Sequence, residues 1–143
     1  MQTFLPYPDF AKTFRVLDKS RLGNQVYREA LTLIRGKWQN HPAAKMWVGY
    51  EHALANYALA GLDELFNRGA HYPHHVITFE TYRCSYPDTG LPWWLGDEAF
   101  HLSHRSNLLR KNAEHYGPIF GDIPADLPYL WPDNKTKTYR TIV

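Results

Sequence analysis

The sequence predicts an all-α protein, a single compact domain of about three main helices with a long irregular loop and an aromatic-rich C-terminal tail. Three stretches carry apolar residues at the i, i+3, i+4, i+7 spacing of an amphipathic helix: 21–35, 42–69 and 98–115. The segments between and after them are divided by Pro and Gly and have no regular period. No internal repeat or linker interrupts the chain, so we expect residues 1–143 to form one domain.

Length and composition exclude several classes of protein. The 143 residues suit one globular domain, and the lone cysteine, Cys84, excludes a disulfide framework. No apolar run approaches the roughly 18 residues that span a bilayer, and the N-terminus lacks a signal-peptide pattern, so we expect a cytoplasmic protein with no membrane partner. A net charge of +2 excludes a histone-like binder, so any binding of nucleic acid must depend on local clusters of charge.

The first long helix is predicted over 21–35, after a short helical turn capped by Asp9. Asp18 and Ser20 are its candidate N-caps. One face is apolar, and at about 100° per residue the opposite face collects Arg21, Asn24, Gln25, Arg28 and Thr32. Glu29 lies on the seam between the faces, so its carboxylate is beside apolar surface and within reach of the arginines.

A second helix is predicted from Pro42 to Gly69. Asn40 or His41 is the cap, and Pro42 takes the first helical position, where no N–H is needed. Apolar spacing continues to Phe66, and Gly69 ends the helix as its C′ residue. The Ala and Gly positions permit close approach, so we expect the first helix to pack against this one.

The rest of the chain gives weaker signals. Residues 70–96 are predicted to be mostly loop, because five Pro and Gly residues punctuate them. Asp97 caps a third helix that runs from Glu98 to about His115 and stops at Gly117-Pro118. The aromatic-rich tail from Ile119 has no regular period.

The polar face of the first helix is the first candidate site. Phosphates can be held by Arg21, Gln25 and Arg28, and Glu29 has the position of a general acid or base. Two opposing effects determine the pKa of Glu29: burial raises it, and the nearby arginines lower it. The alternative is a solvated face with an i, i+4 contact between Gln25 and Glu29. For an isolated helix that alternative is the more common.

The third helix provides a second candidate site. His101, His104 and Asn107 form a stripe of hydrogen-bonding side chains where apolar ones are usual, beside the basic residues Arg105, Arg110 and Lys111. We expect DNA contacts from these six residues and from His41. No metal is expected, because no zinc-ligand pattern is present. His71, His74 and His75 are assigned to the loop, without a function.

Trp93 and Trp94 lie in the Gly- and Pro-rich loop before the basic helix. There they can stack on a base or wedge a duplex, which would make them DNA-binding residues. Equally, they can anchor the loop to the core.

These pieces together resemble the pyrimidine-dimer DNA glycosylases of the phage endonuclease V type. The resemblance depends on Tyr27-Arg28-Glu29 in the first helix, the Asn40–Pro42 turn into a second helix ending at Arg68-Gly69, and the basic third helix with its aromatic tail. It covers residues 1 to about 120 in order and spacing. It implies a small all-helical enzyme that cuts the N-glycosidic bond of a base.

The resemblance also implies roles for particular residues. Glu29 corresponds to the catalytic glutamate of the family, Arg28 to an arginine that contacts phosphate, and Arg21 lies near the position of a family histidine. The family nucleophile is the α-amine of a small residue exposed when the initiator Met is removed. Gln2 is too bulky for that removal, so either the Met1 amine substitutes or the lyase reaction is lost.

The leading hypothesis is therefore a DNA glycosylase that flips and excises a damaged or modified pyrimidine, without a cofactor. Its partner is double-stranded DNA, and we expect a monomer. One alternative is a transferase that modifies a DNA base on the same fold. Others are a non-catalytic DNA-binding module and a helical interaction protein that binds no nucleic acid.

Overall fold

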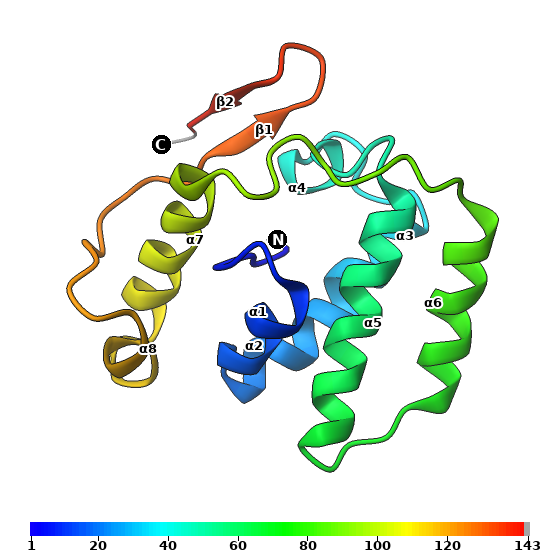
Figure 1. The fold of residues 1–143 in the computed structure, drawn as a ribbon, viewed down its shortest axis with the longest axis horizontal. Coiled ribbons are helices and arrows are strands. Elements are labelled where there is room, and N and C mark those ends of the chain that lie inside the picture. The colour runs from blue at the N-terminus through cyan, green and yellow to red at the C-terminus, as the bar shows by residue number, and fades with distance from the viewer. Residues whose placement is uncertain (142–143) are drawn as a thin grey trace.

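The computed structural model describes residues 1–141 and is mostly helical, as expected (Figure 1). The elements are α1 (Phe10–Val16), α2 (Lys19–Asn24), the π-helix η1 (Gln25–Ala30), α3 (Leu31–Ile34), α4 (Pro42–Lys45), α5 (Glu51–Asn67), α6 (Pro73–Ser85), α7 (Glu98–Lys111), α8 (Ala113–Phe120), β1 (Trp131–Asp133) and β2 (Thr138–Arg140). No helix within residues 1–141 has the length and apolarity needed to cross a membrane.

The first predicted helix is present as α2, η1 and α3 in succession. The residues that join these segments, Asn24, Gln25, Ala30 and Leu31, all have right-handed helical dihedrals, so the helix is continuous. Its middle is a π-helix, a rare form that is frequent at functional sites. Asp18 occupies the N-cap position, but its side chain caps no backbone N–H and binds Arg21 and Tyr116 instead.

The predicted packing of the first two long helices is confirmed. A Cβ atom on Gly61 of α5 would lie 2.7 Å from Val26 Cγ2 in η1 and 3.1 Å from the ring of Phe14 in α1. Only glycine therefore permits this approach.

The second predicted helix is divided, contrary to the expectation of one continuous helix from Pro42 to Gly69. It consists of α4, capped by the His41 side chain as proposed, and α5, with a break at Gly49, whose φ is +85°. Buried Met46 and Trp47 keep the apolar pattern going across the break, which is why periodicity did not reveal it. Gly69, at φ +96°, follows the end of α5 as predicted.

The prediction of mostly loop for residues 70–96 was wrong, because α6 occupies Pro73–Ser85 and holds His74 and His75. It lies alongside α5 on the outside of the molecule (Figure 1). Only Phe79 is fully buried, so the apolar period is weak. The hydroxyl groups of Thr78, Thr81 and Ser85 donate to carbonyls one turn back. Because Ser and Thr are not favoured in helix interiors, these residues weaken the helical pattern of the sequence further.

Two predictions near the C-terminus also need correction. The third helix, α7, ends at Lys111 because Asn112 has non-helical dihedrals and caps α8 by accepting from His115 N–H. Gly117 and Pro118, expected to stop the helix, lie inside α8. The tail is not entirely irregular: β1 and β2 form an antiparallel hairpin that pairs Trp131 with Arg140.

The N-terminal segment, residues 2–6, is buried between α7 and α5 (Figure 1). Leu5 is wholly enclosed and belongs to the same buried cluster as large side chains of α1, α5, α7 and the loops: Phe14, Trp47, Tyr57, Trp94 and Phe100. The core therefore closes around the beginning of the chain.

Candidate active site

Glu29 lines an open pocket of about 180 Å³ where the first helix, the N-terminal segment and the end of α7 meet. The other residues of the pocket wall are Phe4, Ser20, Arg21, Asn24, Gln25 and Lys111. The three residues of the Tyr-Arg-Glu motif point in different directions. Tyr27 packs on Tyr72 and His75 near the start of α6, Arg28 is exposed, and Glu29 faces the pocket.

Two N–H groups hold the Glu29 carboxylate. The backbone N–H of Gln2 donates to Oε2 over 3.3 Å, and the Nε2 of Gln25 donates to the same oxygen over 2.8 Å. Gln25 and Glu29 both belong to the π-helix, where a residue and the fourth one after it lie close together. The i, i+4 contact considered from sequence is thus present, and the two side chains contribute to one pocket.

Gln25 is a buried positioning residue, which differs from the DNA contact expected for it. Its Oε1 accepts the backbone N–H of Phe4 (2.9 Å), and the Tyr57 hydroxyl lies 3.2 Å from the same oxygen, with a nearer acceptor in the Phe4 carbonyl at 2.8 Å. Because the Phe4 N–H is a donor, it fixes Oε1, and the carboxamide points its NH₂ group at Glu29. Tyr57 was not singled out from the sequence, where its place on the apolar stripe indicated only a core residue.

Opposing effects act on the pKa of Glu29. Burial raises it, and the Gln2 N–H, the α-ammonium group of Met1, the Gln25 amide and Lys111 lower it in part. The net pKa is above the usual value of a glutamate, which is the direction suited to proton transfer near neutral pH.

The chain terminus lies close to this carboxylate. The charge of the Met1 α-ammonium acts on Glu29, and it also lowers the pKa of His41 further than burial alone does. His41 accepts the Ala43 N–H through Nδ1 and so caps α4, which is a structural role. Its role as a DNA contact stays a prediction. The amide nitrogen of Gln2, not an amine, makes the direct contact with Glu29.

The cations of the site are placed differently from one another. Arg21 is held by Asp18 over 3.1 Å, and Asp18 in turn accepts the hydroxyl of Tyr116 over 2.6 Å. Arg28 and Asn24 are exposed on the helix, and Lys111 is exposed at the end of α7. These four residues remain candidates for contact with an anionic substrate.

The polar stripe of α7 is buried and binds the N-terminal segment, so it does not form the DNA-contacting face predicted for it. His101 Nδ1 donates to the Leu5 carbonyl (2.7 Å), and His104 Nδ1 accepts the Leu5 N–H (2.9 Å). Arg105, only 9% exposed, donates to the Pro6 carbonyl and pairs with Glu98. A buried backbone needs such partners, which explains polar residues at core positions.

The far side of the stripe holds the C-terminal tail in the same way. Asn107 donates to the Leu127 carbonyl over 3.1 Å, and Arg110 donates to the Ala125 carbonyl over 2.8 Å. Asn107 is fully buried, whereas Arg110 is exposed and keeps part of its guanidinium accessible.

Both tryptophans of the loop are anchors. Trp94 is completely buried and donates its indole N–H to the Met46 carbonyl, so it offers no surface to a duplex. Trp93 donates to Asn134 Oδ1 over 2.8 Å and packs on Tyr139 of β2. Of the two interpretations of this pair, the structure favours attachment to the core.

The family resemblance places the N-terminal amine at the site, but residues 2–6 carry no pattern of their own that indicates that Gln2 and Phe4 lie beside Glu29. Their apolar and Pro-containing composition resembles an ordinary irregular terminus. The signal that could have found them is the polar stripe of α7, which requires buried polar partners from elsewhere in the chain. Within the described residues, no group of three or more His, Cys, Asp or Glu side chains is arranged to hold a metal ion.

The sequence around this site matches a known family. A family model described as pyrimidine dimer DNA glycosylase matches residues 1–78, more than half of the 143-residue chain. The chain therefore belongs to the pyrimidine dimer DNA glycosylase family, which confirms the resemblance. The match includes Met1, Gln25 and Glu29 but stops well before the expected residue 120, so α7, α8 and the hairpin lie outside it. No curated protein and no solved structure matches the chain significantly.

Proposed function

We propose that this protein is a DNA glycosylase that extrudes and excises a damaged or modified pyrimidine, with Glu29 as the catalytic carboxylate. The observation that carries the proposal is the placement of Glu29: half-buried, fixed by two N–H donors, with the chain's α-ammonium group and Lys111 near it. Family membership supplies the reaction class.

The substrate must come to this pocket as an extruded nucleotide, because a stacked base is inaccessible to chemistry. Extrusion costs a few kcal/mol, which phosphate contacts offset. Arg21 and Lys111 line the pocket beside the carboxylate, and Arg28 is exposed on the same helix, so all three suit those contacts. Asn24, which lines the same pocket, and Met1, whose α-ammonium group acts on Glu29, extend this set of proposed contacts.

Glu29 then acts on the sugar. As the N-glycosidic bond breaks, the base leaves with the bonding electrons and C1′ becomes oxocarbenium-like, which a nearby carboxylate stabilises. The same carboxylate takes a proton from the nucleophile that adds to C1′. The nucleophile is water or the Met1 amine, since the Gln2 nitrogen is an amide.

Glu29→Gln tests the catalytic assignment. Duplexes with ultraviolet photoproducts or modified pyrimidines are incubated with each protein, and released base is measured together with DNA affinity. We expect base release to fall by at least about 100-fold, because the acid/base group is removed. Affinity should stay equal or rise slightly, because a negative charge near phosphate is removed.

Glu114→Gln is the matched control, since Glu114 is exposed on α8 and does not line the pocket that holds Glu29. It should leave base release unchanged. If Glu29→Gln keeps full activity, or is inactive only because the protein unfolds, Glu29 is structural and the proposal fails.

A further inference from the structure

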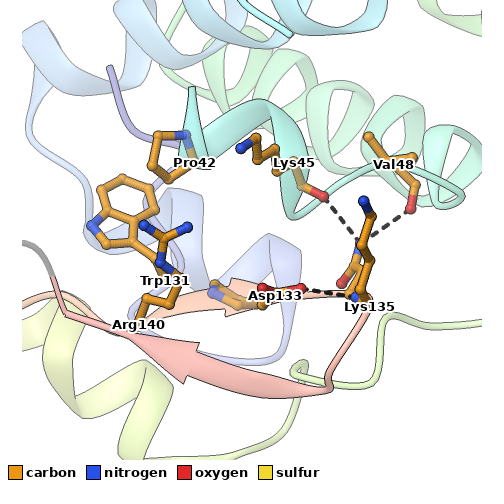
Figure 2. Close-up of a pocket in the computed structure, with 9 residues that line it drawn as sticks. Pro42, Lys45, Val48, Trp131, Asp133, Lys135 and Arg140 are labelled. Carbon is orange, nitrogen blue, oxygen red and sulfur yellow. Dashed lines mark hydrogen bonds between the residues drawn. The ribbon is translucent and has the colours of Figure 1, made fainter. Parts of the chain in front are cut away.

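A second pocket lies outside the candidate active site. It has a volume of about 280 Å³ and opens between α4 and the β1–β2 hairpin (Figure 2). Its apolar wall comes from Pro42, Trp131 and Pro132, with the exposed side chain of Val48 at the edge. A pocket of this size, below the range of drug-sized ligands, fits one flat group.

The charges around this pocket favour an anionic ligand. Lys45, Lys135 and Arg140 project into the space between α4 and the hairpin (Figure 2), against one acidic residue, Asp133. The Asp133 carboxylate already accepts the backbone N–H groups of Lys135 (2.9 Å) and Thr136 (3.4 Å). Three cations against one carboxylate leave the pocket wall with an excess of positive charge.

The pocket is preformed, because Asn134 ties the hairpin to α4. The two N–H bonds of the Asn134 NH₂ group are shared among the carbonyls of Lys45, Met46 and Val48, each 3.1 Å from Nδ2, and its Oδ1 accepts the Trp93 indole N–H. A ligand would not have to order these walls, which reduces the entropic cost of binding.

The pocket lies near the beginning of the chain. The ring of Trp131 contacts that of His41 at a centroid distance of 5.8 Å, and the charge of the Met1 α-ammonium group lowers the pKa of His41 in addition to burial.

We infer that this pocket is a nucleotide subsite, in which a base lies against Pro42 and Trp131 and its phosphate against Lys45, Lys135 and Arg140. An apolar wall with a cationic rim matches a flat base joined to a phosphate. The nucleotide is one that protrudes from the bound DNA, and this source follows from the proposed function. A free mononucleotide has the same chemistry and is the other source.

The test compares binding of two duplexes, one fully paired and one with a single unpaired nucleotide, by fluorescence anisotropy. Val48→Trp fills the pocket without changing charge, and Val48 is 65% exposed, so folding should be unaffected. We expect the preference for the unpaired nucleotide to fall by at least about fivefold, as expected when a base is denied its stacking surface. Titration with thymidine monophosphate, in wild type and variant, tests the free nucleotide as the source.

Lys45→Ala with Arg140→Ala tests the rim. The dependence of log affinity on log salt should become shallower by about one to two units. Lys12→Ala is the control. Lys12 belongs to α1, its ammonium group lies over the ring of Tyr7, and it lines neither pocket. If Val48→Trp binds every nucleotide probe as the wild type does, the subsite is overturned. This holds even if the Lys45→Ala, Arg140→Ala variant changes the dependence of log affinity on log salt. Binding of an acidic peptide in place of nucleotides also overturns it.

These outcomes are independent of catalysis. Base release that depends on Glu29, with Val48→Trp binding unchanged, removes the subsite and leaves the proposed function intact. If Val48→Trp weakens binding of the unpaired nucleotide but the wild-type protein releases no base, the subsite stands and the proposed function fails.

Discussion

At the scale of single residues, two histidines show how this protein satisfies a buried backbone. His101 donates to the Leu5 carbonyl through Nδ1 and accepts the Gly96 N–H through Nε2, so its ring is neutral. His104 accepts the Leu5 N–H through Nδ1, so its proton is on Nε2. Both sets of hydrogen bonds need an uncharged imidazole, so the stability of the fold depends on pH.

His104 should make the protein sensitive to acid. Burial, with a smaller effect of His101, lowers its pKa in the folded state to about 3, against about 6.5 in the unfolded chain. Between these values the unfolded chain binds one more proton, so the free energy of unfolding decreases as pH falls, by up to about 1.4 kcal/mol per pH unit. Above pH 6.5 the residue has no such effect.

Urea denaturation at about pH 7.5, 6 and 5 measures this dependence. His104→Gln keeps an acceptor for Leu5 without a titrating group, so its stability should vary less steeply with pH than that of the wild type. His71→Gln, on the exposed surface, should keep the wild-type slope. Equal slopes for wild type and His104→Gln would show that protonation of His104 does not govern acid stability.

Gln2 and Met1 lead to a prediction about strand cleavage. Gln2 should block removal of Met1, and the structure has the Gln2 amide at 3.3 Å from Glu29, the position an amine would need. We therefore expect intact-mass measurement to find Met1 and strand cleavage to be weak beside base release. Efficient borohydride trapping of the protein on abasic DNA, mapped to the N-terminus, would contradict this prediction.

At the scale of elements, the helix that contains η1 positions the site. Gln25 and Glu29, four residues apart on one helix face, share the pocket wall, while Val26 and Ala30 lie in the core. The packing of α5 against it depends on Gly61, because a side chain there would meet Val26 and Phe14.

Gly61→Ala should lower the free energy of unfolding by about 1–3 kcal/mol, because Val26 and Phe14 are both buried and have little space to move. Gly23→Ala is the control, since a Cβ on Gly23 in α2 meets nothing within 4 Å. The control should stabilise by up to about 1 kcal/mol through helix propensity. Thermal or urea unfolding measures both, and a Gly61→Ala protein as stable as the control would refute the packing argument.

At the scale of the whole molecule, the net charge does not indicate an anionic partner, whereas the distribution of the charges does. The chain carries only +2, yet Arg21 and Lys111 line the pocket of Glu29 with Arg28 exposed on the same helix, and Lys45, Lys135 and Arg140 line the pocket at the hairpin. Other basic residues are used internally, such as Arg68, which donates to three carbonyls at the end of α1.

Arg21→Ala, Arg28→Ala and Lys111→Ala should each weaken DNA binding regardless of sequence. The plot of log affinity against log salt should become shallower by about one unit for each phosphate that the variant no longer neutralises. Anisotropy titrations between low and physiological salt measure both effects, with Lys12→Ala as the unchanged control. Unaltered affinity and slope in all three variants would mean that DNA is not the partner or binds another face.

The sequence by itself determined the local features of this protein. The mostly helical class, the cap at His41, the glycine after α5, and the position of Glu29 between an apolar and a polar face all follow from residues close together in the chain. The family also followed from the sequence, through the motif around Glu29. Helical periodicity and capping are short-range properties, which is why they can be read from sequence.

The tertiary structure alone decided which polar residues are available to a substrate. His101, His104 and Asn107 have the same composition signature as a DNA-binding stripe, yet the N-terminal segment and the tail bury them. Trp94 and Gln25 were likewise withdrawn into the interior. A polar side chain satisfies a buried backbone group or a ligand with the same atoms. Only the position of segments about 20 to 100 residues away along the chain therefore distinguishes the two uses.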